Sequence, residues 1–297
     1  MPIFKVIVLA IVQGLAELLP VSSSAHVVVA EKLMGLDPSS PEMTLLLVML
    51  HTGTMFAVIA FFWNKWKTSY FSSGEAFKRF AVLVIWATLL TGIVGEAIKK
   101  VIEKTFFRGA AKAEIEQLFS HLELIAPALA AAGVLILIAG LLQRRQQKMP
   151  AATSGNPEEP LTIRQAVWMG MVQGLALPFR GFSRSGSTIS TGMLAGAAKE
   201  RAEDFSFALA VVLTPAVVGL EVIRLLKASH VSAAAGAPIN LHAALVASML
   251  GMVFSFAAGM LALKWLSNWL ETGRWYMFGI YCLIASVVVF GLHAHGF

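Results

Sequence analysis

The chain has 297 residues, of which 57% are hydrophobic and 13% are charged, and its formal net charge is +6. A soluble domain carries about 25% charged residues, so this composition excludes a water-soluble globule. It also excludes a disordered chain, which needs low hydrophobicity and high charge. The remaining class is a polytopic membrane protein, in which charged residues are costly and therefore informative.

The first apolar stretch, 3–19, is interrupted by Gln13 and Glu17 and lacks the small-residue cleavage site of a signal peptide. We therefore expect it to be retained. It runs into the break 19–24, which is rich in proline and serine and is followed by a short apolar helix. Non-helical backbone at membrane depth is tolerated only where protein buries it or where it lines a watery cavity.

Six later runs are long enough to cross a hydrocarbon core of about 30 Å at about 1.5 Å per residue. They are 44–63, 80–95, 124–142, 205–226, 241–263 and 275–292. Alternating segments of strand length are missing, so a barrel is untenable and the predicted fold is an all-α helical bundle. The first run contains the polar notch His51-Thr52-Gly53-Thr54, which either lines the bundle interior or packs helices together.

A second broken segment resembles the first. The apolar stretch 166–177 leads into the break 178–187, and Val12-Gln13-Gly14-Leu15-Ala16 recurs letter for letter as Val172-Gln173-Gly174-Leu175-Ala176. Paired, interrupted segments in two halves indicate a binding site at the interface of inverted repeats. We predict one membrane domain of two halves, 1–142 and 163–297, joined by the polar link 143–162.

The two breaks carry different polar groups. The first presents Glu17 and His26 around Ser22, Ser23 and Ser24, and the second presents Arg180 and Arg184 among Ser183, Ser185, Ser187 and Thr188. Arginine forms bidentate bonds to phosphate oxygens, and a helix N-terminus after a glycine-containing turn adds free N–H groups and a favourable dipole. The alternative for the second break is a serine-rich cap with Arg184 reaching the membrane interface.

Glu17 follows a mostly apolar stretch, so we expect its carboxylate to lie at depth, with Gln13 on the same helical face. A buried acid acts as a general base, a metal ligand or half of an ion pair. His26 is either a hydrogen-bonded packing residue or a catalytic group beside Glu17 and the serines.

The motifs resemble a known family. Gln13-Gly14-Leu15-Ala16-Glu17, followed by Pro20-Val21-Ser22-Ser23-Ser24-Ala25-His26, resembles the first signature of the undecaprenyl-diphosphate phosphatases, also called bacitracin-resistance proteins. Gly181-Phe182-Ser183-Arg184-Ser185-Gly186-Ser187-Thr188 resembles the second, and length and hydropathy agree over essentially the whole chain. In one departure, Arg180 stands where the family has proline, as a second phosphate contact or an interfacial anchor. Gln13 is the neutral option at a position where an acid also occurs.

The resemblance implies a bacterial inner-membrane enzyme with two re-entrant segments and a site that faces the periplasm. Such an enzyme removes the terminal phosphate of undecaprenyl diphosphate and so recycles the lipid carrier of cell-wall synthesis. It uses a divalent cation, usually magnesium, for which Glu17 is the implied ligand. The implied catalytic residues are Glu17, Ser23, His26 and Arg184. The predicted substrate-binding residues are Gln13, Ser22, Ser24, Ser183, Ser185, Gly186 and Thr188.

Several alternatives stay open. Either Ser23 attacks the terminal phosphorus while His26 or Glu17 takes its proton, or a water attacks and Ser23 only binds. Inverted repeats with broken helices are also typical of transporters, so a flippase for the lipid carrier is the alternative function. No basic patch alternates with aromatic residues, so we expect membrane lipids and not nucleic acid as partners. The Lys and Arg of the links give no clean orientation, and the sequence is compatible with a homodimer.

Overall fold

The computed structural model describes residues 2–37, 40–106, 122–146, 159–234, 240–270 and 274–296. These residues form ten helices and no strand, so the predicted all-α fold is confirmed. The helices are α1 (Ile3–Leu18), α2 (Ser23–Leu33), α3 (Pro41–Tyr70), α4 (Gly74–Phe106), α5 (Leu122–Gln146), α6 (Ile163–Ala176), α7 (Arg184–Leu194), α8 (Lys199–Ala234), α9 (Leu241–Leu270) and α10 (Trp275–Ala294). Much of the predicted polar link 143–162 lies outside the described residues.

Each of the six predicted spans lies within one long helix, namely α3, α4, α5, α8, α9 or α10. In the described part of the chain, all six are long and apolar enough to cross a membrane. The helices continue past the predicted ends, as α3 does through Lys65 and Lys67 to Tyr70. Helical hydrogen bonds are internal to the segment, so polar residues can extend a helix beyond the hydrocarbon.

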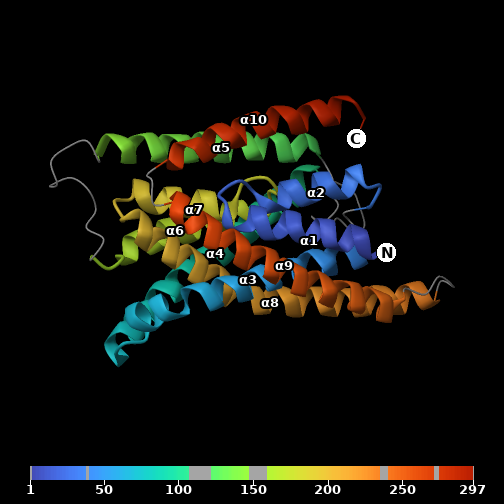
Figure 1. Cartoon of the computed structure of the whole chain (residues 1–297), viewed down its shortest axis with the longest axis horizontal. Coiled ribbons are helices and arrows are strands. Elements are labelled where there is room, and N and C mark those ends of the chain that lie inside the picture. The colour runs from blue at the N-terminus through green and yellow to red at the C-terminus, as the bar shows by residue number, and fades with distance from the viewer. Residues whose placement is uncertain are drawn as a thin grey trace.

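The same order of elements occurs twice along the chain. Two short helices precede three long ones in α1–α5, and the pattern recurs in α6–α10. Because an odd number of long helices separates the two pairs, the second pair enters the bundle from the opposite end. Figure 1 shows this arrangement, with α1 starting at the end where both termini lie and α6 starting at the other. The α5–α10 pair runs along one edge of the bundle.

The repeated pentapeptide places a glycine at a helix crossing in each half. A Cβ at Gly14 would lie 2.5 Å from the Cβ of Ala258 on α9, and one at Gly174 would lie 2.6 Å from the carbonyl oxygen of Thr91 on α4. Thr91 Oγ1 also donates to the carbonyl of Gly170 at 2.9 Å. Such close approach of backbones is typical of membrane helix packing. The first short helix of each half, α1 or α6, therefore packs against a long helix of the other half, and the halves interlock.

The crossing of α3 and α9 is equally close. A Cβ at Gly53 would lie 2.2 Å from the carbonyl oxygen of Met252. Three residues further along α9, Ser255 Oγ donates to the carbonyl of Leu50 at 2.6 Å, which ties the same two helices together. For Gly53, the packing interpretation of the polar notch is therefore confirmed.

The Gly53→Ala variant is expected to unfold at a lower temperature than the wild type. The added methyl has no room against α9, and overpacking of this kind costs about 1–3 kcal/mol. The measurement is thermal unfolding of the purified protein in detergent. Gly92→Ala is the matched control, because a Cβ at Gly92 meets nothing within 4 Å. Equal unfolding temperatures for the two variants would contradict this account.

Candidate active site

Both pairs of short helices, which we call the hairpins, break in the same way. α2 begins at Ser23 and α7 at Arg184, and the preceding residues, Ser22 and Ser183, are N-caps. Ser22 has φ 66° and Ser183 has φ 48°, and in the described ranges no other non-glycine residue has a positive φ. This left-handed region is costly for a residue with a Cβ and clusters at functional sites. The two predicted breaks and the helix predicted to follow the second one are confirmed, although α2 and α7 begin inside the predicted bounds 19–24 and 178–187.

The turns of the two hairpins meet inside the bundle. A Cβ at Gly186 would lie 3.0 Å from the carbonyl oxygen of Pro20 and 2.7 Å from Cδ1 of Ile136. The first turn of α7 therefore presses directly on the turn of the first hairpin. Gly186, predicted to bind substrate, allows this close approach, and its role toward the substrate stays a prediction.

Glu17 is the centre of the site. Its side chain is only 4% exposed, and its Oε2 accepts hydrogen bonds from Ser23 Oγ at 2.5 Å and from Gln13 Nε2 at 2.9 Å. Its Oε1 accepts a hydrogen bond from Arg184 Nη2, with which it forms an ion pair. Ser23 and Arg184 are the first residues of α2 and α7, so both helix N-termini converge on one carboxylate. The structure thus brings together four of the predicted site residues.

His51 is a fifth member of this cluster. Its Nε2 lies 3.3 Å from Oε2 of Glu17, and its Nδ1 lies 2.9 Å from the carbonyl oxygen of Leu47. The sequence placed His51 in the polar notch but did not connect it with Glu17. A titratable side chain in the middle of an apolar run was the available signal, since such residues are rare in membrane helices unless functional.

Arg184 retains unused hydrogen-bonding capacity. Its Nη2 holds Glu17, whereas its Nη1 is buried and has no hydrogen-bond partner in the described part of the chain. A buried donor without a partner costs about 1–3 kcal/mol, so an acceptor is expected here. In addition, Ser183 Oγ satisfies only the N–H of Gly186 in the first turn of α7. The remaining first-turn N–H groups have no partner within the helix, and they favour an anion.

The other predicted binding residues shape the turns. Ser22 Oγ accepts from the N–H of Ala25 at 3.4 Å and lies 3.3 Å from Ser24 Oγ. Thr188 Oγ1 is buried and bonded to Ser206 Oγ on α8 at 2.6 Å, and it donates to the carbonyl of Arg184. Ser185 is also buried. The structure gives these groups supporting contacts, and their binding of substrate stays a prediction.

His26 faces a different neighbour. Its Nε2 is 2.7 Å from the hydroxyl of Tyr281 on α10, its Nδ1 is 2.8 Å from the carbonyl of Ser22, and its ring stacks on that of Tyr281. Together the two rings help to line an apolar cavity of about 270 Å³ between α2, α5 and α10. The hydrogen bonds of His26 therefore do not join it to Glu17 or Ser23, and its catalytic role stays a prediction.

Arg180 interacts with the far end of α2. Glu31 of that helix is fully buried. Burial raises the pKa of the Glu31 carboxyl to about 7, and the positive charge of Arg180 opposes this rise. The interaction joins the second break to the first hairpin. Whether Arg180 is a second phosphate contact or an interfacial anchor stays a prediction.

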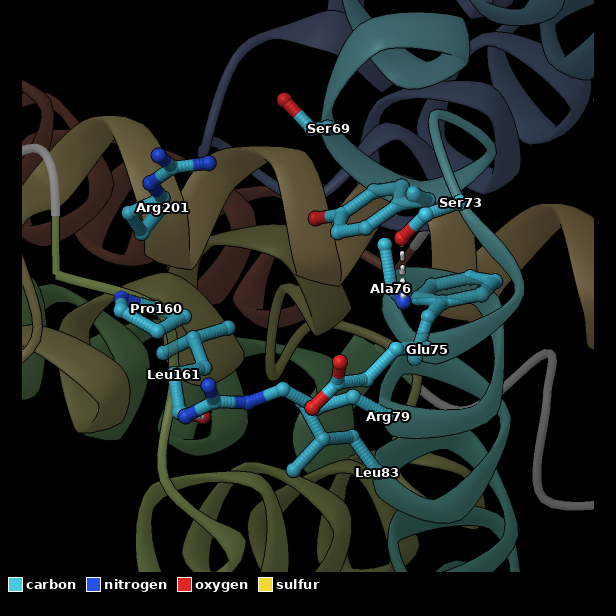
Figure 2. A pocket seen from close by; sticks show the side chains of 11 residues that line it. Ser69, Ser73, Glu75, Ala76, Arg79, Leu83, Pro160, Leu161 and Arg201 are labelled. Carbon is cyan, nitrogen blue, oxygen red and sulfur yellow. Dashed lines mark hydrogen bonds between the residues drawn. The ribbon is translucent and has the colours of Figure 1, made fainter.

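A separate cavity of about 290 Å³ lies at one end of the bundle (Figure 2). It is bounded by the end of α3, the start of α4 and Pro160–Leu161, and its charged lining residues are Glu75, Arg79 and Arg201. No predicted site residue is among those that line it. The Glu17 cluster, which unites the two repeated motifs, is therefore the candidate active site.

Comparison with known proteins agrees with the motifs. Residues 6–288 match the family described as bacitracin resistance protein BacA. A protein of Acinetobacter baylyi named undecaprenyl-diphosphatase 2 is 55% identical over 292 residues, which cover 98% of both chains. One from Burkholderia thailandensis with the same name is 32% identical and covers 98% of this chain and 97% of its own. A Polaromonas undecaprenyl-diphosphatase is 30% identical over 97% of this chain and 94% of its own. Because the family match spans nearly the whole chain, the chain belongs to the bacitracin resistance protein BacA family.

Proposed function

We propose that the chain hydrolyses undecaprenyl diphosphate to undecaprenyl phosphate and inorganic phosphate. Family membership and the names of the relatives support this activity. The structural observation that carries it is Arg184, which holds Glu17 with one nitrogen and keeps a second, buried nitrogen without a partner at the start of α7. A phosphate oxygen supplies the acceptor that this geometry lacks. The product is the lipid carrier that cell-wall synthesis reuses.

The direct test is phosphate release by the purified protein in detergent. Undecaprenyl diphosphate should yield inorganic phosphate, and undecaprenyl phosphate, which has no anhydride bond, should yield none. Movement of the diphosphate across vesicles without phosphate release would favour the flippase alternative. The names of the relatives give that alternative no support.

The geometry supports attack by Ser23. Its Oγ already donates to Glu17, so the carboxylate is placed to receive the proton as Oγ bonds to the terminal phosphorus. The bond from that phosphorus to the bridging oxygen breaks, and undecaprenyl phosphate leaves with the electron pair. Water then hydrolyses the phosphoserine and releases inorganic phosphate. In the alternative route, water attacks directly and Ser23 only orients the phosphate.

The Glu17→Gln variant is expected to lose about a hundredfold or more in phosphate release, because the amide keeps the shape but cannot take a proton. The measurement is the initial rate with undecaprenyl diphosphate at saturation. Glu31→Gln is the matched control, since it makes the same change at another buried glutamate, on α2. Near-wild-type activity in the Glu17 variant would argue against Glu17 as the base.

The divalent cation implied by the family fits poorly with Glu17 as the structure holds it. Both carboxylate oxygens face donors or cations, namely Gln13, Ser23, His51 and Arg184. Gln13 stands where a second acid would help to bind a metal. Among the described residues, no group of three or more His, Cys, Asp or Glu could hold an ion. We therefore expect magnesium to be carried by the diphosphate oxygens and not by Glu17.

We also propose that the chain lies in the bacterial inner membrane with the site facing the periplasm. Family resemblance supports this location. In the described helices, Lys and Arg are more frequent at the end of the bundle where α3 and α5 end. These residues are Lys65, Lys67, Lys78, Arg79, Arg144, Arg145, Arg164, Lys199, Arg201, Lys264 and Arg274. Under the positive-inside rule, this excess in the described helices supports a cytoplasmic position for this end and a periplasmic one for the start of α1.

A further inference from the structure

His51 is oriented toward Glu17 by its own helix. The carbonyl oxygen of Leu47, 2.9 Å from Nδ1, can only accept, so Nδ1 carries a hydrogen and the ring is fixed with Nε2 pointing away from α3. Nε2 then lies 3.3 Å from Oε2 of Glu17. When Nε2 carries a hydrogen, it is directed at this oxygen and the two groups form an ion pair.

The pair matters because of where His51 comes from. Gln13 and Ser23, the other groups that bond Oε2, belong to the first hairpin together with Glu17 itself. His51 belongs to α3, whose backbone is fixed next to it by the close contact of Gly53 with α9 and by the bond from Ser255 to Leu50. It therefore links the carboxylate to a rigid element outside the hairpin.

His51 is also the partner of Glu17 for which no contact with the substrate is proposed. Arg184 divides its guanidinium between Glu17, which Nη2 holds, and the phosphate proposed for Nη1, so the phosphate competes with the carboxylate for its charge. The carboxylate then needs another restraint to keep Oε2 directed at Ser23. A catalytic group is effective only when its orientation is held within about 10–20°.

We propose that His51 is a positioning residue that holds the Glu17 carboxyl in the orientation from which it takes the proton of Ser23. This inference rests on the proposed hydrolysis of undecaprenyl diphosphate. The sequence motifs place site residues only in the two hairpins, and His51 adds a residue from α3 to this site. His51 acts through Glu17 and does not touch the substrate.

The test compares His51→Leu with His51→Gln. Leucine fills similar space without a donor, whereas the glutamine amide can donate to Glu17 in place of Nε2. His51→Leu is expected to lower kcat for undecaprenyl diphosphate about 10–100-fold, the usual loss when a group that orients an active-site ligand is removed. KM should change little, and His51→Gln should restore most of the rate. Thr52→Val is the matched control on the same helix, since Thr52 Oγ1 donates to the carbonyl of Val48 within α3.

A double-mutant cycle separates positioning from folding. In a Glu17→Gln background, His51→Leu should cause no further loss of kcat, because the two residues act as a unit. Additive losses, equal losses in both His51 variants, or a raised KM with unchanged kcat would each overturn the proposal. Phosphate release by the wild-type protein is measured first. If the wild type releases no phosphate, the proposed function itself fails, independently of the His51 variants.

Discussion

Replacing Arg184 with alanine is expected to lower phosphate release about ten-thousand-fold, within the range that an arginine contributes to phosphoryl transfer. The variant removes the charge that binds the phosphate, and it also leaves the buried Glu17 carboxylate without its ion-pair partner. The measurement is kcat/KM for undecaprenyl diphosphate, together with the unfolding temperature. An unchanged unfolding temperature would show that the loss comes from the site.

Two further variants test whether the geometry and the position of the Arg184 guanidinium matter as well as its charge. Arg184→Lys keeps the charge but not the planar fork that matches phosphate geometry, so it should recover only a small part of the activity. Arg180→Ala is the comparison at a nearby arginine, whose charge acts on Glu31 of α2. A larger loss in Arg180→Ala than in Arg184→Ala would refute the assignment of the phosphate site.

The Ser23→Ala variant is expected to release phosphate about a thousandfold more slowly if Ser23 is the nucleophile, with a residual rate from binding and electrostatics. Rapid acid quenching of the wild-type reaction should trap a phosphoserine, which mass spectrometry of the digested protein assigns to a residue. Ser286→Ala is the control, because Ser286 Oγ donates to the carbonyl of Leu283 within α10 and is not part of the Glu17 cluster. Full activity in Ser23→Ala would leave direct attack by water as the mechanism.

Local features of the sequence were enough to predict the helices and the heart of the site. Apolar runs of sufficient length determine spans almost independently of their partners, and all six occur as helices. The cluster of Gln13, Glu17, Ser23 and Arg184 was also predictable, because the repeated pentapeptide relates the two breaks to each other. Repeats that enter from opposite ends bring such breaks to the same depth.

The rest depends on how the helices rotate and pack. The contact between His51 and Glu17 joins α3 to the first hairpin, and no pattern within either segment specifies it. The rotation of α2 turns His26 toward Tyr281, which lies far along the chain. In the same way, the packing of α7 on α8 engages Thr188 with Ser206. Hydropathy gives the buried face of a helix, but it does not give the side chain that this face meets.

The first short helix of each half packs against a long helix of the other half, and this affects when the protein can assemble during synthesis. α1 is translated before α9, the helix that receives Gly14, and seven described helices lie between the two in the chain. Until then the first hairpin, with Glu17 and Ser23, has no docking surface for this face. During insertion into the membrane, the face of α1 around Gly14 must therefore stay free of non-native helix contacts until α9 is present. The first hairpin docks on this face only once α9 has been made, so we expect a chain that terminates before α9 to contribute no activity.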